Sequence, residues 1–195
     1  MNLALFDFDG TITSKDSLVD FIQYAVGKPK YYSGLLVLSP ILMAFKLKLI
    51  ANDHAKQQLI SYFFKNWQET EFQRIATEYS VQQIDKITRP KAMQKIAWHQ
   101  QQGHDLVIVS ASMQSWLNQW CEQQGITLIS TQLEMQDGLV TGKFATKNCH
   151  GAEKVARIKA QYNLSEYREI YAYGDSSGDK EMLAIATQPH YRYFE

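Results

Sequence analysis

The stretch LALFDFDGTIT, residues 3 to 13, decides the fold. Its first six residues are apolar except for Asp7, and the run stops at Gly10, a pattern typical of a strand that is buried on both faces of a parallel sheet. In a strand, residues i and i+2 face the same side about 6.5 Å apart, so we expect the carboxylates of Asp7 and Asp9 to share one face. At an effective dielectric constant of about 20, two such charges repel each other by roughly 2 to 3 kcal/mol. The pair therefore predicts a bound cation.

The block from Ser14 to about Thr88 differs from the rest of the chain. No strand-like stretch is evident in it, and apolar residues recur every three or four positions, as in an amphipathic helix. We expect helices at about 18–26, 30–48, 52–64 and 69–82. These ranges predict an all-helical cap over residues 14–87, inserted directly after the first strand.

Helix and strand patterns alternate after Pro90. An Asp137-Gly138 pair between two alternating runs is a strong hairpin signal. The alternation predicts a doubly wound, Rossmann-like α/β core of three layers with a parallel sheet, formed by residues 1–13 and 88–195. Helices are expected at 91–102, 113–124, 152–162 and 178–186, and strands at 106–110, 126–130, 169–174 and 190–194.

Polar residues follow the predicted strands at one edge of the sheet, where the ligand of a doubly wound fold binds. Carboxylate oxygens without a nearby histidine or cysteine suit Mg²⁺, which keeps some of its waters and also binds a substrate phosphate. We therefore expect a site for Mg²⁺ and phosphate at this edge. The residues at the strand ends are Asp7, Asp9, Gly10 and Thr11 after the first strand, Ser110 after LVIV, and Asp175 and Asp179 after EIYAYG.

The same residues supply the parts of a phosphoryl-transfer site. Gly10 and Thr11 offer backbone amides at a turn, Ser110 offers a hydroxyl and Lys154 a positive charge. The carboxylate of Asp7 can attack phosphorus to give an aspartyl phosphate, while a second acid two residues away protonates the leaving oxygen and then activates water. Taken singly, DFDG also fits an ordinary turn and GDSSGD a helix-capping loop. Their joint occurrence at successive strand ends is the more specific signal.

Composition excludes several other classes of protein. The 195 residues are enough for one domain, or for a core with a modest insertion. Twenty basic and twenty acidic residues balance without long blocks, which argues against nucleic-acid binding. The two cysteines lack the spacing of a zinc site or a disulfide framework. The chain begins with the strand-like MNLALFDF rather than a secretory leader, so we expect a cytoplasmic protein.

A nearly continuous apolar run from Leu35 to Phe45 has two interpretations. It is about half of the ~20 residues that a membrane span needs, and Pro40 lies in its middle, so no transmembrane span is expected. A buried or interfacial helix pair bent at Pro40 fits the length better. Packing within the cap is the first interpretation, and peripheral membrane contact is the alternative. The flanking basic residues are Lys28, Lys30, Lys46 and Lys48.

Four motifs in this order, DFDGTIT, VIVSAS, CHGAEK and YGDSSGD, resemble those of the haloacid dehalogenase superfamily. The helical insertion after the first motif is similar to the cap of its phosphoserine phosphatase-like branch, subfamily IB. The resemblance implies that Asp7 is the nucleophile and Asp9 the general acid/base, as in the phosphatases of the superfamily. It also implies that Ser110 with the adjacent Ala111, and Lys154, bind phosphate. Mg²⁺ would be held by Asp175, the Asp7 carboxylate and the Asp9 backbone carbonyl, with Asp179 supporting the metal shell.

The substrate stays open between several alternatives. Phosphoserine phosphatases carry a glutamate nine residues beyond the nucleophile, where this chain has the shorter Asp16, a candidate specificity residue. The apolar run in the cap is similar to that of phosphatidylglycerophosphatase C-type members, which act on a lipid phosphate. The sequence thus predicts a Mg²⁺-dependent phosphatase acting on a small or lipid-like phosphomonoester. Phosphoryl transfer to an acceptor other than water, and a noncatalytic module that binds a membrane surface or a partner through the cap, are the alternatives.

Overall fold

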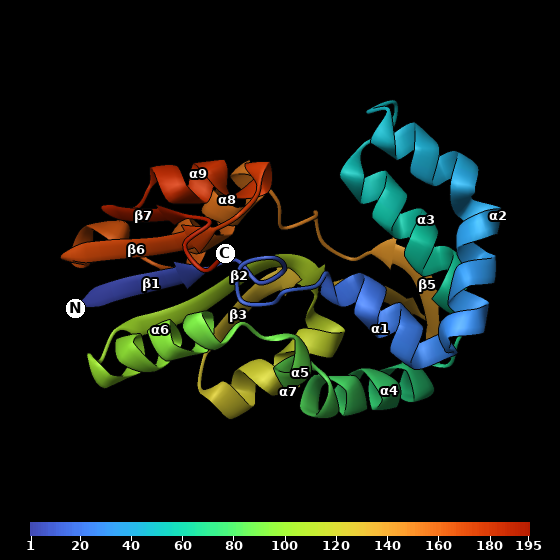
Figure 1. Cartoon of the computed structure of the whole chain (residues 1–195), viewed down its shortest axis with the longest axis horizontal. Coiled ribbons are helices and arrows are strands. Elements are labelled where there is room, and N and C mark those ends of the chain that lie inside the picture. The colour runs from blue at the N-terminus through green and yellow to red at the C-terminus, as the bar shows by residue number, and fades with distance from the viewer.

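The core of the molecule is a parallel five-stranded sheet. A computed structural model describes all residues 1–195 and orders the strands β3-β2-β1-β6-β7, so that β1 lies in the middle (Figure 1). All the pairings in this sheet are parallel. The predicted α/β core with a parallel sheet is therefore confirmed. The strands are β1 (Asn2–Phe6), β2 (Asp105–Met113), β3 (Thr127–Thr131), β6 (Glu169–Gly174) and β7 (Gln188–Tyr191).

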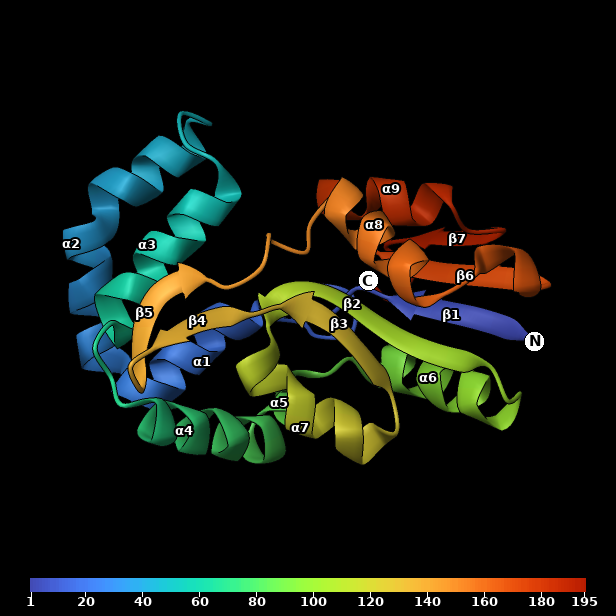
Figure 2. The ribbon, with the colours of Figure 1, turned by 180° about the vertical axis from the view of Figure 1, so that it is seen from behind.

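Alternate residues of β1 point to opposite faces of the sheet, and each face is covered by helices (Figures 1 and 2). Ala4 and Phe6 are buried in a cluster with residues of α6 (Pro90–Gln101) and α7 (Gln114–Gln124). Leu3 and Leu5 are buried in a second cluster, with residues of α8 (Ala152–Gln161) and α9 (Lys180–Ala184). The apolar run that opens the chain is thus buried on both sides, which gives the three layers.

The block between β1 and α6 is helical. The chain enters and leaves this block side by side, because Thr13 pairs with Thr88 in an antiparallel bridge. The amide of Ser14 donates to the carbonyl of Ile87 (2.8 Å) next to that bridge. This pairing brings the first turn of the cap close to the end of β1. The helices of the block are α1 (Ser17–Val26), α2 (Lys28–Lys46), α3 (Asn52–Phe64), α4 (Glu69–Gln82) and the short α5 (Ile84–Ile87).

The expected hairpin at Asp137-Gly138 is confirmed and joins β4 (Leu133–Gln136) to β5 (Leu139–Phe144). Both turn residues have positive φ, 52° and 73°, as a tight hairpin turn requires. The hairpin packs against the cap: Leu139 pairs with Gln68 in an antiparallel bridge. Gly142 lies so close to Ser61 of α3 that a Cβ there would overlap it. The helical cap therefore shares its packing with a hairpin from the second half of the chain.

Helix α2 runs without interruption through Pro40, close to the expected range of 30–48, and is not divided into the pair of helices that the apolar run suggested. Proline removes the N–H that would bond to the carbonyl four residues earlier, that of Leu36. The hydroxyl of Ser39 donates to this carbonyl instead (2.8 Å), which keeps it satisfied. The ribbon changes direction partway along α2 but remains one helix (Figures 1 and 2). None of the helices combines the length and the apolarity that crossing a bilayer requires.

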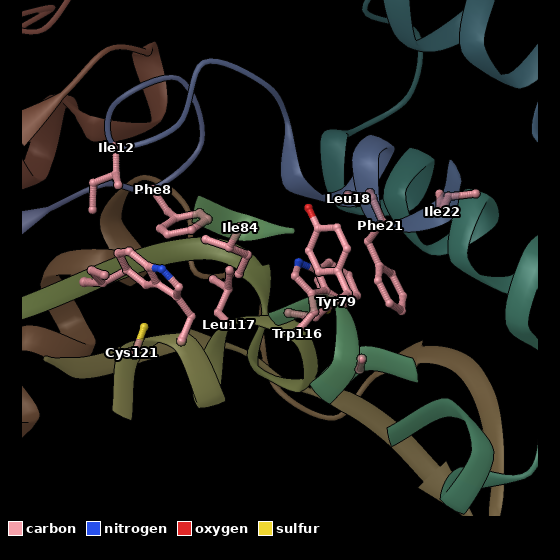
Figure 3. Close-up of a cluster of buried hydrophobic side chains, with 14 of the residues drawn as sticks. Phe8, Ile12, Leu18, Phe21, Ile22, Tyr79, Ile84, Trp116, Leu117 and Cys121 are labelled. Carbon is pink, nitrogen blue, oxygen red and sulfur yellow. The ribbon is translucent and has the colours of Figure 1, made fainter. Parts of the chain in front are cut away.

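One continuous hydrophobic cluster connects the sheet to the cap (Figure 3). Phe8, just after β1, packs edge-on against Trp120 of α7 at a centroid distance of 5.6 Å. Phe21 of α1 stacks on Trp116 of α7 at 4.7 Å. Aromatic pairs of this kind add about 0.5 to 1.5 kcal/mol each beyond the area they bury. The base of the cap is thus anchored to the core beside the first motif.

Candidate active site

Asp7 lies directly after the central strand β1. Its backbone amide donates to the carbonyl of Tyr173 on β6 (2.9 Å), which continues the sheet by one residue. Its carboxylate is buried and accepts from Lys154 Nζ (2.5 Å) through Oδ1 and from the Thr11 hydroxyl (3.4 Å) through Oδ2. Burial, opposed by Lys154, raises the pKa of Asp7 to about 7.

Lys154 enters the site from the first turn of α8 and is fully buried. Its Nζ lies between two carboxylates, 2.5 Å from Asp7 and 2.7 Å from Asp179. Burial alone would lower the pKa of Lys154, but these two ion pairs outweigh it and the pKa is raised. Burial would likewise raise the pKa of Asp179, and the contact with Lys154 lowers it instead. The site thus contains one fixed ammonium group.

Three carboxylates, those of Asp7, Asp175 and Asp179, bring oxygen atoms within 4.8 Å of one another. Asp175 accepts from the Thr11 hydroxyl (3.2 Å), and its pKa is raised, first of all by burial. Gly10 has a φ of 83°, and a Cβ there would lie 2.8 Å from Asp175 Cγ, so only glycine fits beside this carboxylate. The site holds three carboxylates but only one fixed ammonium group, and the atoms that the carboxylates offer to a metal are all hard oxygens. This donor set fits a divalent cation such as Mg²⁺.

Both carboxylate oxygens of Asp179 accept hydrogen bonds. Its Oδ2 accepts from the amides of Asp175 (3.2 Å) and Ser176 (3.0 Å) and from the Ser176 hydroxyl (2.8 Å), while Oδ1 accepts from Lys154. Asp179 therefore fixes both Lys154 and the loop that carries Asp175.

Asp9 has a different set of partners from Asp7, although the two are only two residues apart. Its carboxylate accepts from the Ser17 amide (2.7 Å) at the first residue of α1 and from the Ser112 hydroxyl. Ser17 in turn donates to the Ser112 hydroxyl (3.0 Å) and accepts from Trp116 Nε1 (3.3 Å). Burial, followed by the negative charge of Asp16, raises the pKa of Asp9 to about 6. The carboxylate of Asp9 is thus held by the cap and by β2, outside the group of three.

The remaining predicted site residues surround a cavity of about 310 Å³. Ser110, at the point where the pairing of β2 with β3 shifts register, accepts from the Ser112 amide (3.0 Å). Asp16 caps the N-terminus of α1 by accepting from the Val19 amide (3.1 Å), and its side chain also borders the cavity. The cavity is lined by Asp7, Asp9, Asp16, Asn52, Lys56, Ser110, Ala111, His150, Lys154, Ser176, Ser177 and Asp179.

Several residues of the site were not predicted from the sequence. Asn52 and Lys56 lie one turn apart on α3, and that spacing indicates a shared helix face, but nothing in the sequence says what the face meets. His150 precedes Lys154 by four residues, just before α8, and no pattern in the sequence marks it as part of the site. Ser112 follows Ser110 by two residues within VIVSAS, a spacing that would have placed it on the same face of the strand.

The arrangement provides a buried carboxylate, a fixed ammonium group and a second acid around one polar cavity. Ala111 is its only apolar lining residue. Of the cap residues that border it, Asp16 and Lys56 carry opposite charges. A ligand that fits this cavity is therefore anionic near Lys154 and polar on the side of the cap.

The chain is similar to known proteins in sequence and in fold. The model of the haloacid dehalogenase-like hydrolase family matches residues 4–184. Protein CicA of Caulobacter vibrioides is 33% identical over 194 residues, which cover 98% of this chain and 86% of CicA. A solved structure from Bordetella pertussis Tohama I, of unknown function, has a TM-score of 0.83 at 21% identity and covers 96% of this chain and 88% of its own. A phosphoserine phosphatase solved as a phospho-aspartyl intermediate analogue has a TM-score of 0.61 at 20% identity, covering 94% and 82%.

Proposed function

The chain belongs to the haloacid dehalogenase-like hydrolase family and is a phosphatase, and we propose that it hydrolyses phosphomonoesters through an aspartyl phosphate on Asp7. The observation that carries the proposal is the environment of Asp7. This carboxylate directly follows the central strand, borders the cavity and is paired with the only fixed ammonium group there. A nucleophilic carboxylate needs this position, because its oxygen must face phosphorus while a cation offsets the charge of the phosphoryl group.

In the first step, an oxygen of Asp7 attacks phosphorus and the bond from phosphorus to the leaving oxygen breaks. Asp9 gives its proton to that oxygen, and burial, which raises the pKa of Asp9, favours this role. In the second step, Asp9 takes a proton from water, the water oxygen bonds to phosphorus, and the bond to Asp7 breaks. Inorganic phosphate is released and both carboxylates return to their starting forms.

Lys154 and Ser110 hold the phosphoryl oxygens in this proposal, together with backbone amides near Gly10, Thr11 and Ala111. Asp179 pairs with the ammonium group of Lys154 and holds it in this position. Mg²⁺ would be bound by Asp7 and Asp175, with the Asp9 carbonyl and Asp179 in support. When bound, it neutralises part of the negative charge on the phosphoryl group.

The polar cavity favours a phosphomonoester whose leaving group is polar next to the phosphate. Asp16 and Lys56 lie on the cap side of the cavity and would contact that group. Both small phosphomonoesters and the headgroup of a lipid phosphate meet this requirement. An apolar chain would have to lie outside the cavity, because Ala111 is the only apolar residue that lines it.

The test uses p-nitrophenyl phosphate and the Asp7→Asn variant. We expect the variant to lose phosphate release completely while keeping its circular dichroism spectrum, because asparagine fills the same space but is not a nucleophile. Asp137→Asn, on the exposed turn of the hairpin, is the matched control and should be as active as the wild type. EDTA should stop the wild-type reaction, and added Mg²⁺ should restore it. Release of phosphate by Asp7→Asn would rule out Asp7 as the nucleophile.

A further inference from the structure

Helix α2 has two apolar faces, and only one of them is covered. Tyr31, Gly34 and Leu38 are buried on the inner face. Gly34 approaches the rings of Tyr62 and Phe63 on α3 so closely that a Cβ would overlap them. This face forms the packing between α2 and α3 that the cap interpretation predicted.

The outer face carries an apolar stripe of largely exposed side chains. Tyr32, Leu36 and Met43 follow one another at helical spacing, with Pro40 between Leu36 and Met43, so they lie on one side of the helix, and Leu47 follows four residues later at the C-cap. Their exposed fractions are 57%, 77%, 57% and 62%. Figures 1 and 2 show α2 at the outer edge of the molecule, with α3 on its inner side. A helix that is apolar on both sides is normally covered on both.

The turn after α2 extends the stripe. Leu49 is 73% exposed, and Lys48 before it has a φ of 59°, so the backbone turns sharply between two exposed leucines. We call Tyr32, Leu36, Met43, Leu47 and Leu49 the α2 surface. Large exposed apolar side chains gathered on one short segment mark an interaction surface.

The charge around the α2 surface has a single sign. Lys28 and Lys30 stand at the start of α2, Lys46 and Lys48 at its end, and all four are exposed. No aspartate or glutamate occurs from Lys28 through Asn52. None of the four lysines forms an ion pair within the chain, whereas the arginine of α4 pairs with two glutamates.

We propose that the α2 surface docks on an anionic lipid membrane. The apolar side chains would enter the boundary between headgroups and acyl chains, with α2 in the plane of the membrane and the lysines at both ends on anionic headgroups. A second copy of the chain fits less well, because a symmetric contact would bring lysines of one copy onto those of the other with no carboxylate between them.

Docking would also bring the membrane close to the cavity. The turn that carries Leu49 leads directly into α3, whose Asn52 and Lys56 line the cavity. The docking proposal goes beyond the proposed function and does not depend on it, since the α2 surface shares no residue with the cavity.

The experiment is sedimentation of the full chain with vesicles of phosphatidylcholine, with and without an equal part of phosphatidylglycerol. The wild type should sediment with the anionic vesicles and much less with the neutral ones. Leu36→Ser with Met43→Ser should weaken the partition by at least about tenfold, because both side chains are exposed and only the membrane contact is lost. Lys46→Glu with Lys48→Glu should weaken it as strongly, and high salt should do the same to the wild type.

Two controls make the result decisive. Val81→Ser on α4 and Lys159→Glu on α8 change an exposed apolar and an exposed basic residue elsewhere, and both should bind like the wild type. All variants should hydrolyse p-nitrophenyl phosphate equally without vesicles, which separates a loss of docking from a loss of folding or catalysis. The proposal is overturned if the wild type stays in solution with anionic vesicles, or if the Leu36 and Met43 variant binds them undiminished. A dimer in sedimentation equilibrium that this variant dissolves would assign the surface to self-association instead.

Discussion

Lys154 Nζ lies 2.5 Å from Oδ1 of Asp7, across 147 positions of the chain. Both groups are buried, so each depends on the other for its charge. The same ammonium group also pairs with Asp179, which gives a buried triad of two acids and one base. Such a triad is costly to break, because the remaining charges lose their partner without regaining water.

Lys154→Met should therefore affect both stability and activity. Methionine keeps most of the length of the side chain but leaves Asp7 and Asp179 without their cation. We expect the free energy of unfolding to fall by about 3 to 5 kcal/mol without added metal. Phosphate release should fall by a factor on the order of a hundred to a thousand, because the phosphoryl group loses a charged partner. Urea unfolding and steady-state kinetics measure the two effects.

Lys159→Met provides the control for this variant. Lys159 lies on the same helix but is exposed, so its loss should change stability by less than about 0.5 kcal/mol and leave the kinetics unchanged. Full activity of Lys154→Met would show that the ion pair with Asp7 is structural only.

Ser112→Ala tests whether the position of Asp9 matters. The Ser112 hydroxyl donates to the Asp9 carboxylate and lowers its pKa, in opposition to burial. Without this bond the pKa of Asp9 should rise, so that Asp9 keeps its proton to higher pH. We expect kcat to fall about tenfold as the carboxylate loses its orientation, and the alkaline limb of the kcat/KM profile to move to higher pH.

Ser130→Ala is matched to Ser112→Ala. Ser130 is paired with Ser110 across β2 and β3, is buried, and its hydroxyl has no hydrogen-bond partner. The pH profile of the Ser130→Ala variant should be that of the wild type. A lower kcat for Ser112→Ala with an unmoved alkaline limb would argue for a general loss of packing instead.

The first motif was readable from the sequence because its two signals are local. An apolar run from Leu3 to Phe8 indicates a buried strand, and the acids next to it lie at the strand end whatever the rest of the chain does. Ser110 and Asp175 follow two further predicted strands, and the carboxyl ends of parallel strands meet at the same edge of the sheet. In the structure, Asp7, Asp175 and Asp179 bring oxygen atoms within 4.8 Å of one another, and Lys154 pairs with Asp7 and Asp179.

The partners of Asp9 were not readable in the same way. Strand periodicity gave Asp7 and Asp9 one shared face, but β1 ends at Phe6, and the turn directs the two side chains to different partners. The contact with Ser112 spans 103 positions and depends on how the cap meets β2. The Leu36 carbonyl, which loses its helical donor at Pro40, is likewise satisfied by a side chain, the hydroxyl of Ser39. Such contacts arise from tertiary packing, which neither propensity nor periodicity describes.

Gly10→Ala tests how tightly the first motif is fitted around Asp175. A Cβ at this position would press on the Asp175 carboxylate, and the φ of 83° adds backbone strain. We expect loss of most activity and a higher Mg²⁺ requirement, measured as the Mg²⁺ concentration that gives half-maximal rate. Gly103→Ala is the control, because its φ of 67° brings similar strain while nothing lies within 4 Å of the added Cβ. Equal losses in the two variants would assign the effect to the backbone alone.

His99 predicts a dependence of stability on pH that is separate from the active site. Its side chain is fully buried and contacts His104 (Nδ1 to Nδ1, 2.7 Å) and the Tyr173 hydroxyl (3.1 Å). Burial, followed by the positive charges of Lys95, His104 and His190, lowers the pKa of His99 from 6.5 to about 3. Between these values the unfolded chain binds one proton more than the folded one. The contribution of His99 to the free energy of unfolding therefore falls as the pH drops below 6.5, by at most about 1.4 kcal/mol per pH unit.

The measurement is urea unfolding of the wild type and His99→Gln at about pH 7.5 and about pH 5. Asp7 and Asp9 act in the opposite direction, because their raised pKa values make the folded state bind more protons in this range. Only the difference between the two proteins isolates His99. We expect the variant to be less stable at the higher pH but to lose about 1 to 2 kcal/mol less than the wild type on acidification. His54→Gln, an exposed substitution on α3, is the control and should lose as much stability on acidification as the wild type. If His99→Gln also loses as much stability as the wild type, His99 already carries its proton in the folded protein.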